Sequence, residues 1–126
     1  MSVEVYGRVI QEWCGATGMT PWNPAEDMNV EVDGTVVGLI YNADLDPGTL
    51  HLYFDLGHLE YPDLHKTLLQ ANALIEPDGN GYFALHPESG SVVYRSDLAL
   101  TEQTSGSALP ELLGSLLDVA RQRVLA

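Results

Sequence analysis

The stretch from residue 64 to residue 100 constrains the fold of this chain most strongly. It begins with a short segment whose apolar residues recur at helical spacing, and a break rich in proline and glycine follows at 77–81. Two runs of β-forming residues, 82–86 and 92–100, come next and are joined by a Pro-Glu-Ser-Gly turn. The stretch therefore predicts a helix that packs beside two antiparallel strands, and none of its residues is placed for catalysis.

Helical spacing recurs at both ends of the chain. Residues 3–14 carry apolar side chains at the positions of an amphipathic helix, and Gly15 and Gly18 can end it. A second leucine-rich helix is predicted to start near Ser107, with a proline tolerated in its first turn. The chain thus has a predicted helix at each end and one in the middle.

Alternating apolar and polar residues predict three strands between the first two helices, at 28–32, 35–41 and 50–56. Asp33 and Gly34 form a hairpin signal between the first two of these strands. The predicted order is helix, three strands, helix, two strands and helix. We expect an α+β fold in which the helices pack on an antiparallel twisted sheet.

Length and charge limit what such a chain can do. Its 126 residues indicate one domain, and the net charge of −13 comes from 18 acidic against 5 basic residues. Such a surface repels phosphate backbones, which argues against nucleic acid as a partner and favours a basic or mixed-charge one. A purely solubilising role for the charge is the alternative. The longest apolar runs fall far short of the roughly 20 residues of a membrane span, so no membrane partner is expected.

Three segments, taken in order, resemble a known family. They are LHLYFDLGHL at 50–59, LLQANAL at 68–74 and YFALHPESGSVV at 82–93, and a leucine-rich last helix follows them. Together they resemble the class I type III secretion chaperones, the Tir-chaperone family. The resemblance covers nearly the whole chain and implies a single chaperone-like domain over residues 1–126, with no enzymatic activity and no cofactor.

The resemblance also implies partners and a compartment. It implies an acidic homodimer in the bacterial cytoplasm that holds the N-terminal region of a secreted effector extended on its surface. The dimer would deliver this cargo to the secretion apparatus without using ATP itself, and the secretion ATPase is a further candidate partner. The lone cysteine and the lack of a recognisable signal peptide agree with a reducing compartment.

The middle helix is the usual dimer element of the family. Its apolar stripe gives the expected dimer interface: Leu64, Leu68, Ala71 and Ile75. Pairing with its own copy about a two-fold axis would bury this stripe from both sides. The alternative is that the stripe packs on the sheet of its own subunit.

Cargo binding needs apolar surface that stays open after folding. The second and third predicted strands carry apolar or aromatic residues on both faces, so one face could serve the core and the other a partner. The expected effector-binding residues are Val37, Leu39, Tyr41, His51 and Tyr53. Val36 and Ile40 lie on the other face of the second strand, and the sequence does not decide which face is open. The alternative is that helices cover both faces.

Other chemistry finds little support in the sequence. The four histidines lack metal-binding spacing, and Cys14 falls on the inner stripe of the first helix, as a buried thiol would. The histidines are His51, His58, His65 and His86. Two other functions stay open: a regulatory or sensory module of the same fold that binds a folded protein, and a small hydrolase with a carboxylate site.

Overall fold

A computed structural model of the chain describes residues 2–59, 62–73 and 81–125. Its elements follow the predicted order of helix, three strands, helix, two strands and helix. They are α1 (Ser2–Thr17), β1 (Met28–Val32), β2 (Thr35–Ile40), β3 (Thr49–Gly57), α2 (Leu64–Ala73), β4 (Tyr82–Leu85), β5 (Val92–Ala99), the 3-10 turn η1 (Gly106–Ala108) and α3 (Leu109–Leu125). The predicted α+β fold is confirmed.

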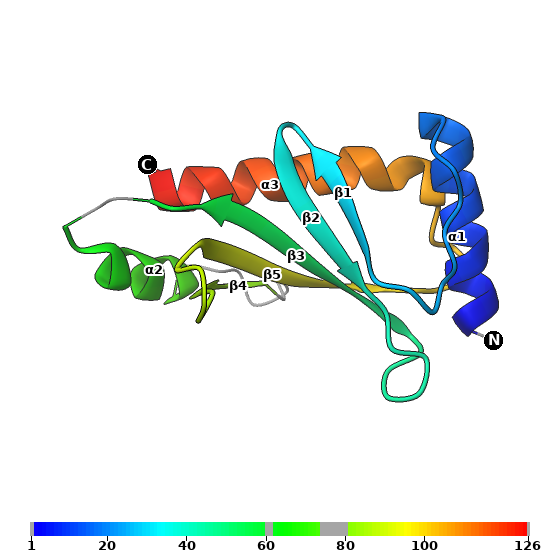
Figure 1. Cartoon of the computed structure of the whole chain (residues 1–126), viewed down its shortest axis with the longest axis horizontal. Helices are drawn as coiled ribbons and strands as arrows, with labels where there is room; N and C mark the ends of the chain where they lie inside the picture. The colour runs from blue at the N-terminus through cyan, green and yellow to red at the C-terminus, as the bar shows by residue number, and fades with distance from the viewer. Residues whose placement is uncertain (1, 60–61, 74–80, 126) are drawn as a thin grey trace.

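The five strands form one antiparallel sheet in the order β1-β2-β3-β5-β4. The β1–β2 hairpin turns on Asp33 and Gly34, whose φ angles of 49° and 78° are those that a tight two-residue hairpin turn requires. The sheet is strongly twisted, and α1 and α2 lie at opposite ends of the elongated molecule (Figure 1). α3 runs along the sheet between these two ends (Figure 1).

The core lies between the helices and one face of the sheet, which we call the core face. Six strand side chains on this face are at most 1% exposed: Val37, Leu39, Leu50, Leu52, Phe54 and Val92. The helices contribute side chains that are equally buried: Tyr6, Val9 and Ile10 from α1 and Leu113 and Leu117 from α3. Each such side chain stabilises the fold by roughly 1.5–3 kcal/mol when fully buried, so this face supplies most of the hydrophobic stabilisation.

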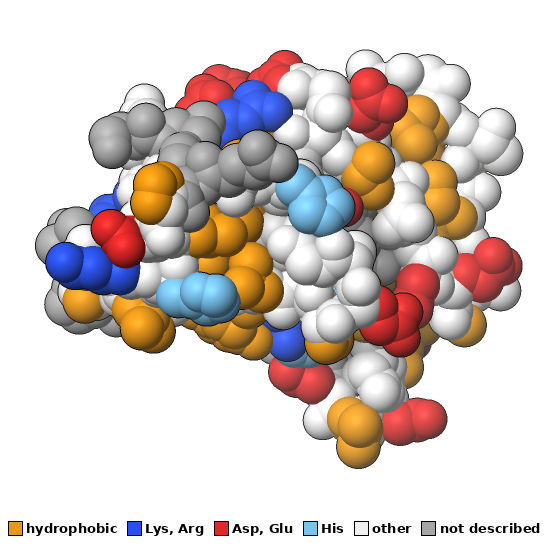
Figure 2. Space-filling view, turned by 60° about the vertical axis from the view of Figure 1, so that its left-hand side comes forward, with side chains coloured by type: hydrophobic (Ala, Val, Ile, Leu, Met, Phe, Trp, Pro, Cys, Tyr) orange, Lys and Arg blue, Asp and Glu red, His pale blue; other side chains and the backbone are white. Residues whose placement is uncertain are grey.

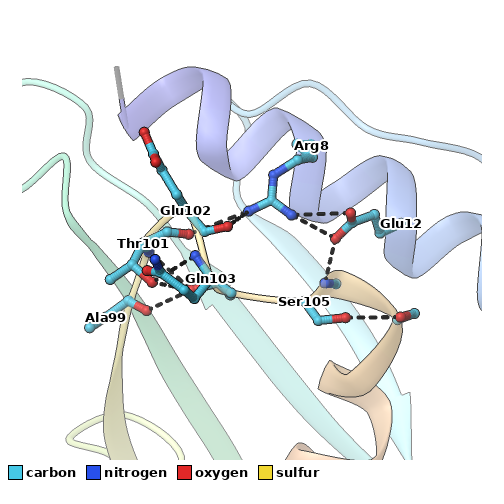
Figure 3. A network of polar contacts seen from close by, with 10 residues as sticks. Arg8, Glu12, Ala99, Thr101, Glu102, Gln103 and Ser105 are labelled. Atoms are coloured by element: carbon cyan, nitrogen blue, oxygen red, sulfur yellow. Dashed lines mark hydrogen bonds and ion pairs between the residues drawn. The ribbon is translucent and has the colours of Figure 1, made fainter.

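α1 is anchored by a polar network that ties it to the segment after β5 (Figure 3). Arg8 Nη1 lies 2.9 Å from Glu12 Oε1, one helical turn away, and Arg8 Nη2 donates to the Thr101 and Glu102 carbonyl oxygens at 3.3 and 3.2 Å. Glu12 Oε1 also accepts a 2.8 Å hydrogen bond from the Gly106 N–H. The network therefore fixes how α1 lies against the start of η1.

Gly106 is required at this contact for steric reasons. A Cβ atom at this position would overlap the Val9 carbonyl oxygen and would lie 2.8 Å from Glu12 Cβ. Both neighbours belong to α1, and one of them is backbone that cannot move aside without shifting the helix. The absence of a side chain at Gly106 thus lets α1 and η1 approach closely enough to cover one end of the core.

An amide side chain closes part of the outer edge of β4. Asn72 Oδ1 accepts a 2.6 Å hydrogen bond from the Phe83 N–H, and Asn72 Nδ2 donates to the Phe83 carbonyl oxygen at 3.2 Å. The Asn72 amide therefore takes the place that a neighbouring strand would occupy. We call this pair of bonds the Asn72 clamp, and it holds α2 beside the sheet.

Two helix boundaries differ from those predicted. α1 continues through Gly15 and ends at Thr17, where Gly18, with a φ of 75° and a hydrogen bond to the Cys14 carbonyl oxygen, forms the helix C-cap. A glycine inside a helix costs only about 1 kcal/mol, which the buried stripe of α1 outweighs. α3 begins at Leu109 because residues 106–108 form the tighter η1 turn.

Candidate protein-binding surface

The second face of the sheet is not covered by the helices, and we call it the open face. Strand register places on it every second residue of each strand: Asn29, Glu31, Val36, Gly38, Ile40, His51, Tyr53, Asp55, Tyr82, Ala84, Val93, Arg95 and Asp97. Three large apolar side chains remain substantially exposed there, with Val36 at 49%, Ile40 at 38% and Tyr82 at 46%. The open face thus presents apolar surface that the fold itself does not use.

An aromatic and cationic row crosses the open face. Tyr53 of β3, Arg95 of β5 and Tyr82 of β4 are direct cross-strand neighbours. The Arg95 guanidinium lies 5.3 Å from the centre of the Tyr53 ring and 5.7 Å from that of Tyr82, and its Nη1 donates to the Tyr82 hydroxyl at 3.0 Å. Stacking and this hydrogen bond hold the three side chains as a single platform.

His51 is held on the open face by two carboxylates. Its Nδ1 lies 2.7 Å from Asp97 Oδ1 on the neighbouring strand β5, and its Nε2 lies 3.7 Å from Asp46 Oδ2 in the loop before β3. These contacts fix the ring orientation of His51. The imidazole therefore forms a polar boundary to the apolar surface around Ile40, its neighbour on β2.

A groove of about 510 Å³ lies over the β1–β2–β3 part of the open face. Its floor consists of open-face residues: Val36, Gly38, Ile40, Tyr53 and Val93. One side is formed by the start of β1 with Asp27, and the other carries Asp55 and residues of the β4–β5 turn such as His86 and Ser89. The groove therefore has a largely apolar floor between two carboxylates.

Three of the five predicted effector-binding residues lie on the core face, which corrects their assignment. Val37 and Leu39 are fully buried, and Tyr41 is 7% exposed with its hydroxyl bonded to the Pro47 carbonyl oxygen at 2.8 Å. Burial also raises the pKa of the Tyr41 phenol. The reason is that α1 and α3 cover this face. A charged residue at Leu39 would therefore destabilise the fold, and the variant could not be used to measure cargo binding.

His51 and Tyr53 do lie on the open face, and both are partly exposed. They share it with Val36 and Ile40, which the sequence placed on the alternative face of the second strand. Their role in binding stays a prediction. Gly38, in the middle of β2, is the floor residue that sequence reasoning missed, although a glycine inside a strand pattern often marks a close approach of a ligand or another backbone.

The expected dimer stripe on α2 divides between core and surface. Leu68 and Ala71 are 5% and 3% exposed and pack in the core of their own subunit, as the alternative held for them, and Leu64 is partly buried against that core. Ile75 lies outside the described residues. Leu69, by contrast, is 70% exposed on α2. Figure 2 shows hydrophobic side chains gathered on the side of the molecule that carries α2.

Two features that other functions would require, a metal-binding cluster and a membrane-spanning helix, are not found in the part of the chain that the structure describes. No three or more His, Cys, Asp or Glu side chains among residues 2–59, 62–73 and 81–125 are grouped to hold a metal ion. No helix among them combines the length and apolar character of a membrane span. Cys14 is 4% exposed, and burial raises the pKa of its thiol, which disfavours the reactive thiolate.

No family model and no curated protein matches this sequence. Solved structures do match over nearly the full length. One is the Yersinia pestis type III secretion chaperone SycH in complex with a stable fragment of YscM2, with a TM-score of 0.68 and 24% identity over 93% of this chain and 98% of that chain.

Two other complexes give still higher structural similarity. The HopA1–SchA chaperone–effector complex matches with a TM-score of 0.73 and 19% identity, over 100% of this chain and 98% of that chain. The ExsC–ExsE complex matches with a TM-score of 0.77 and 19% identity, over 98% and 95%. The chain therefore has the fold of type III secretion chaperones, as the sequence resemblance implied.

Proposed function

We propose that this chain is a bacterial, non-enzymatic chaperone that binds the N-terminal region of a secreted effector and delivers it to a type III secretion system. The observation that carries the proposal is the open face, which leaves apolar side chains uncovered on one side of a fold shared with chaperones in complex with partners. In the proposal the chain acts in the bacterial cytoplasm, and the secretion ATPase receives the loaded complex.

The open face suits an extended polypeptide better than a folded domain. Val36, Ile40 and Tyr53 lie on neighbouring strands and form part of the apolar floor of the groove. An extended segment can place every second side chain on such a surface while its remaining side chains face solvent. Burial of the apolar side chains would hold the segment without a compact fold, and it requires no ATP.

Charge substitutions on the open face test the cargo site. The chain is co-expressed with candidate effectors as wild type or as the Val36→Glu/Ile40→Glu double variant, and the complexes are subjected to limited proteolysis. The wild type is expected to protect an N-terminal segment of its cargo. The double variant should lose most of the bound cargo, because a buried, unpaired charge in the interface costs several kcal/mol.

A matched control comes from α3. Val119 is 45% exposed, close to the 49% of Val36, but it lies on a helix away from the open face. Val119→Glu should therefore leave cargo binding unchanged. Full binding by a folded Val36→Glu/Ile40→Glu variant would overturn the open face as the cargo site.

Homodimer formation is part of the same proposal. The outer surface of α2 carries the highly exposed Leu69 and the partly buried Leu64. Pairing of this surface with a second copy would remove an apolar region from water that the single subunit leaves uncovered. Leu68 and Ala71 would support the interface from beneath by holding α2 on its own core.

Light scattering tests the dimer. The wild-type chain is expected to give a dimer mass at micromolar concentration, and Leu69→Lys should shift it to the monomer while the circular dichroism spectrum is retained. Leu112→Lys on α3 is the control, since Leu112 is also exposed, at 38%. A wild-type monomer, or a Leu69→Lys variant that stays dimeric, would contradict this interface.

A further inference from the structure

Gly38 is the most unusual residue in the floor of the groove, because it is a glycine inside a regular strand. This glycine lies in the middle of β2, paired with Asn29 on one side and Tyr53 on the other without a register shift. It is not one of the glycines with positive φ, so its backbone conformation does not require glycine. A Cβ atom there would lie 3.4 Å from Asn29 Oδ1 and from Tyr53 Cβ, at the near limit of ordinary contact.

Glycine inside a strand weakens it, because glycine loses more conformational freedom on folding and packs no side chain. The missing side chain at Gly38 leaves a hollow in the floor of the groove, flanked along β2 by Val36 and Ile40. Neither a turn nor a bulge accounts for this glycine. A side chain from another molecule that enters the hollow would account for it.

The sides of the groove are acidic. Asp27 and Asp55 line opposite sides, and both are exposed. Asp55 Oδ1 accepts a 2.9 Å hydrogen bond from the Gly57 N–H, but neither carboxylate forms an ion pair with a lysine or arginine among the described residues. Arg95 lies between the Tyr53 and Tyr82 rings, donates to the Tyr82 hydroxyl and does not line the groove.

We propose that the groove over Gly38 receives a long basic side chain, arginine or lysine, from the extended segment of the partner. The aliphatic stem would lie on Val36, Gly38 and Ile40, and the charged head would reach one of the two carboxylates, Asp55 near Val36 or Asp27 near Ile40. This inference rests on the proposed function, because it specifies the cargo that the open face selects.

Other occupants fit the groove less well. An acidic side chain would meet two carboxylates in a chain of net charge −13. A purely apolar side chain would fill the floor but leave the carboxylates at the sides without a partner. A long basic side chain satisfies both parts, since lysine and arginine bury their methylene stems on apolar surface and keep the charge at the solvent boundary.

Labelled peptides test this specificity directly. The probes are fluorescein-labelled peptides of about ten residues, long enough to form a strand, in which valine and threonine alternate and the central residue is arginine, leucine or glutamate. Binding to the full chain is measured by fluorescence anisotropy at low and at physiological salt. The arginine peptide is expected to bind about fivefold more tightly than the leucine peptide at low salt, a preference that added salt reduces.

Two variants locate the effect. The Asp27→Asn/Asp55→Asn double variant should remove the preference for arginine, whereas Glu111→Gln/Asp118→Asn, which removes the same charge from exposed positions on α3, should retain it. Gly38→Val should fill the hollow and weaken all the peptides. Its circular dichroism spectrum checks that it folds, since the new Cβ would lie 3.4 Å from Asn29 Oδ1 and Tyr53 Cβ.

The outcomes separate this inference from the proposed function. Equal or tighter binding of the leucine peptide, or a preference for arginine that survives the Asp27→Asn/Asp55→Asn change, would overturn the basic-side-chain assignment and leave the open face as a cargo site. If the Val36→Glu/Ile40→Glu variant and the Gly38→Val variant both keep full cargo binding, the basic-side-chain assignment and the open face as a cargo site are both overturned.

Discussion

The two faces of the sheet are built from the same strands but differ in burial, since the helices cover only one of them. On the core face, Leu39 and Phe54 are fully buried beneath the helices, while on the open face Ile40, the neighbour of Leu39 in β2, is 38% exposed. Both faces of β2 are apolar, yet only one is needed for folding. A strand that is apolar on both faces in a sheet covered on one side therefore retains surface for a partner.

The sharpest test of this comparison is to truncate adjacent residues of β2. Leu39→Ala is expected to lower the free energy of unfolding by about 2–5 kcal/mol, because it removes buried methyl groups and leaves a cavity. Ile40→Ala should cost less than about 1 kcal/mol, since Ile40 already contacts solvent. Urea unfolding followed by circular dichroism measures both values.

Equal losses for Leu39→Ala and Ile40→Ala would break the comparison, because they would mean that both faces of β2 are covered in solution. A fluorescent hydrophobic dye provides an independent check. The folded wild type should bind the dye, and Val36→Glu/Ile40→Glu should bind less of it, since that variant removes exposed apolar surface from the open face.

Two glycines in the helical cover of the core face, Gly106 and Gly15, are expected to respond in opposite ways to substitution by alanine. Gly106→Ala should cost about 1–3 kcal/mol, because the new methyl group would force α1 and η1 apart. Gly15→Ala should instead stabilise the fold by about 0.5–1 kcal/mol, since Gly15 is exposed inside α1 with open space around it. Opposite signs in thermal unfolding are the expected result, and a neutral Gly106→Ala would show that η1 does not need this contact.

The smallest expected effect concerns pH and the α1 network. The Gly106 N–H, together with Arg8, lowers the pKa of the Glu12 carboxyl below its ordinary value of 4.5. The stabilisation from ionised Glu12 is thus complete above that value and is lost as the pH falls through its lower folded pKa. The difference in urea midpoint between wild type and Glu12→Gln should be present at neutral pH and disappear in acid. If the difference in urea midpoint persists below the folded pKa of Glu12, it arises from packing and not from the ionised carboxylate.

Most of the fold could be predicted from the sequence because its signals are local. The Asp33–Gly34 turn and the alternation in β3 each depend on residues close together in the chain, and both appear as expected. The choice of open face could not be predicted in this way. Val37 and Val36 are chemically identical, and only the placement of α1 and α3 determines which of them is buried.

For the same reason, the sequence could not decide which apolar side chains of α2 pack in the core of their own subunit and which stay exposed. Leu68 and Leu69 are adjacent and equally apolar, but one is 5% exposed and the other 70%. An apolar stripe shows that a helix will bury a face, whereas the identity of the covering surface depends on contacts between distant segments. Gly38 is the local signal that could have located the groove, since a glycine inside a strand often marks a place where a ligand or another backbone approaches closely.

The Asn72 clamp has a consequence under the proposed function, in which the chain binds extended polypeptides. A sheet that meets loose polypeptides at high concentration is at risk of recruiting them as extra strands and of seeding fibrous aggregates. By occupying the backbone groups of Phe83, the amide of Asn72 blocks that growth at β4. If the chain binds effectors as proposed, they are thus kept from pairing with this edge of the sheet, and edge-to-edge association of two subunits through β4 is disfavoured.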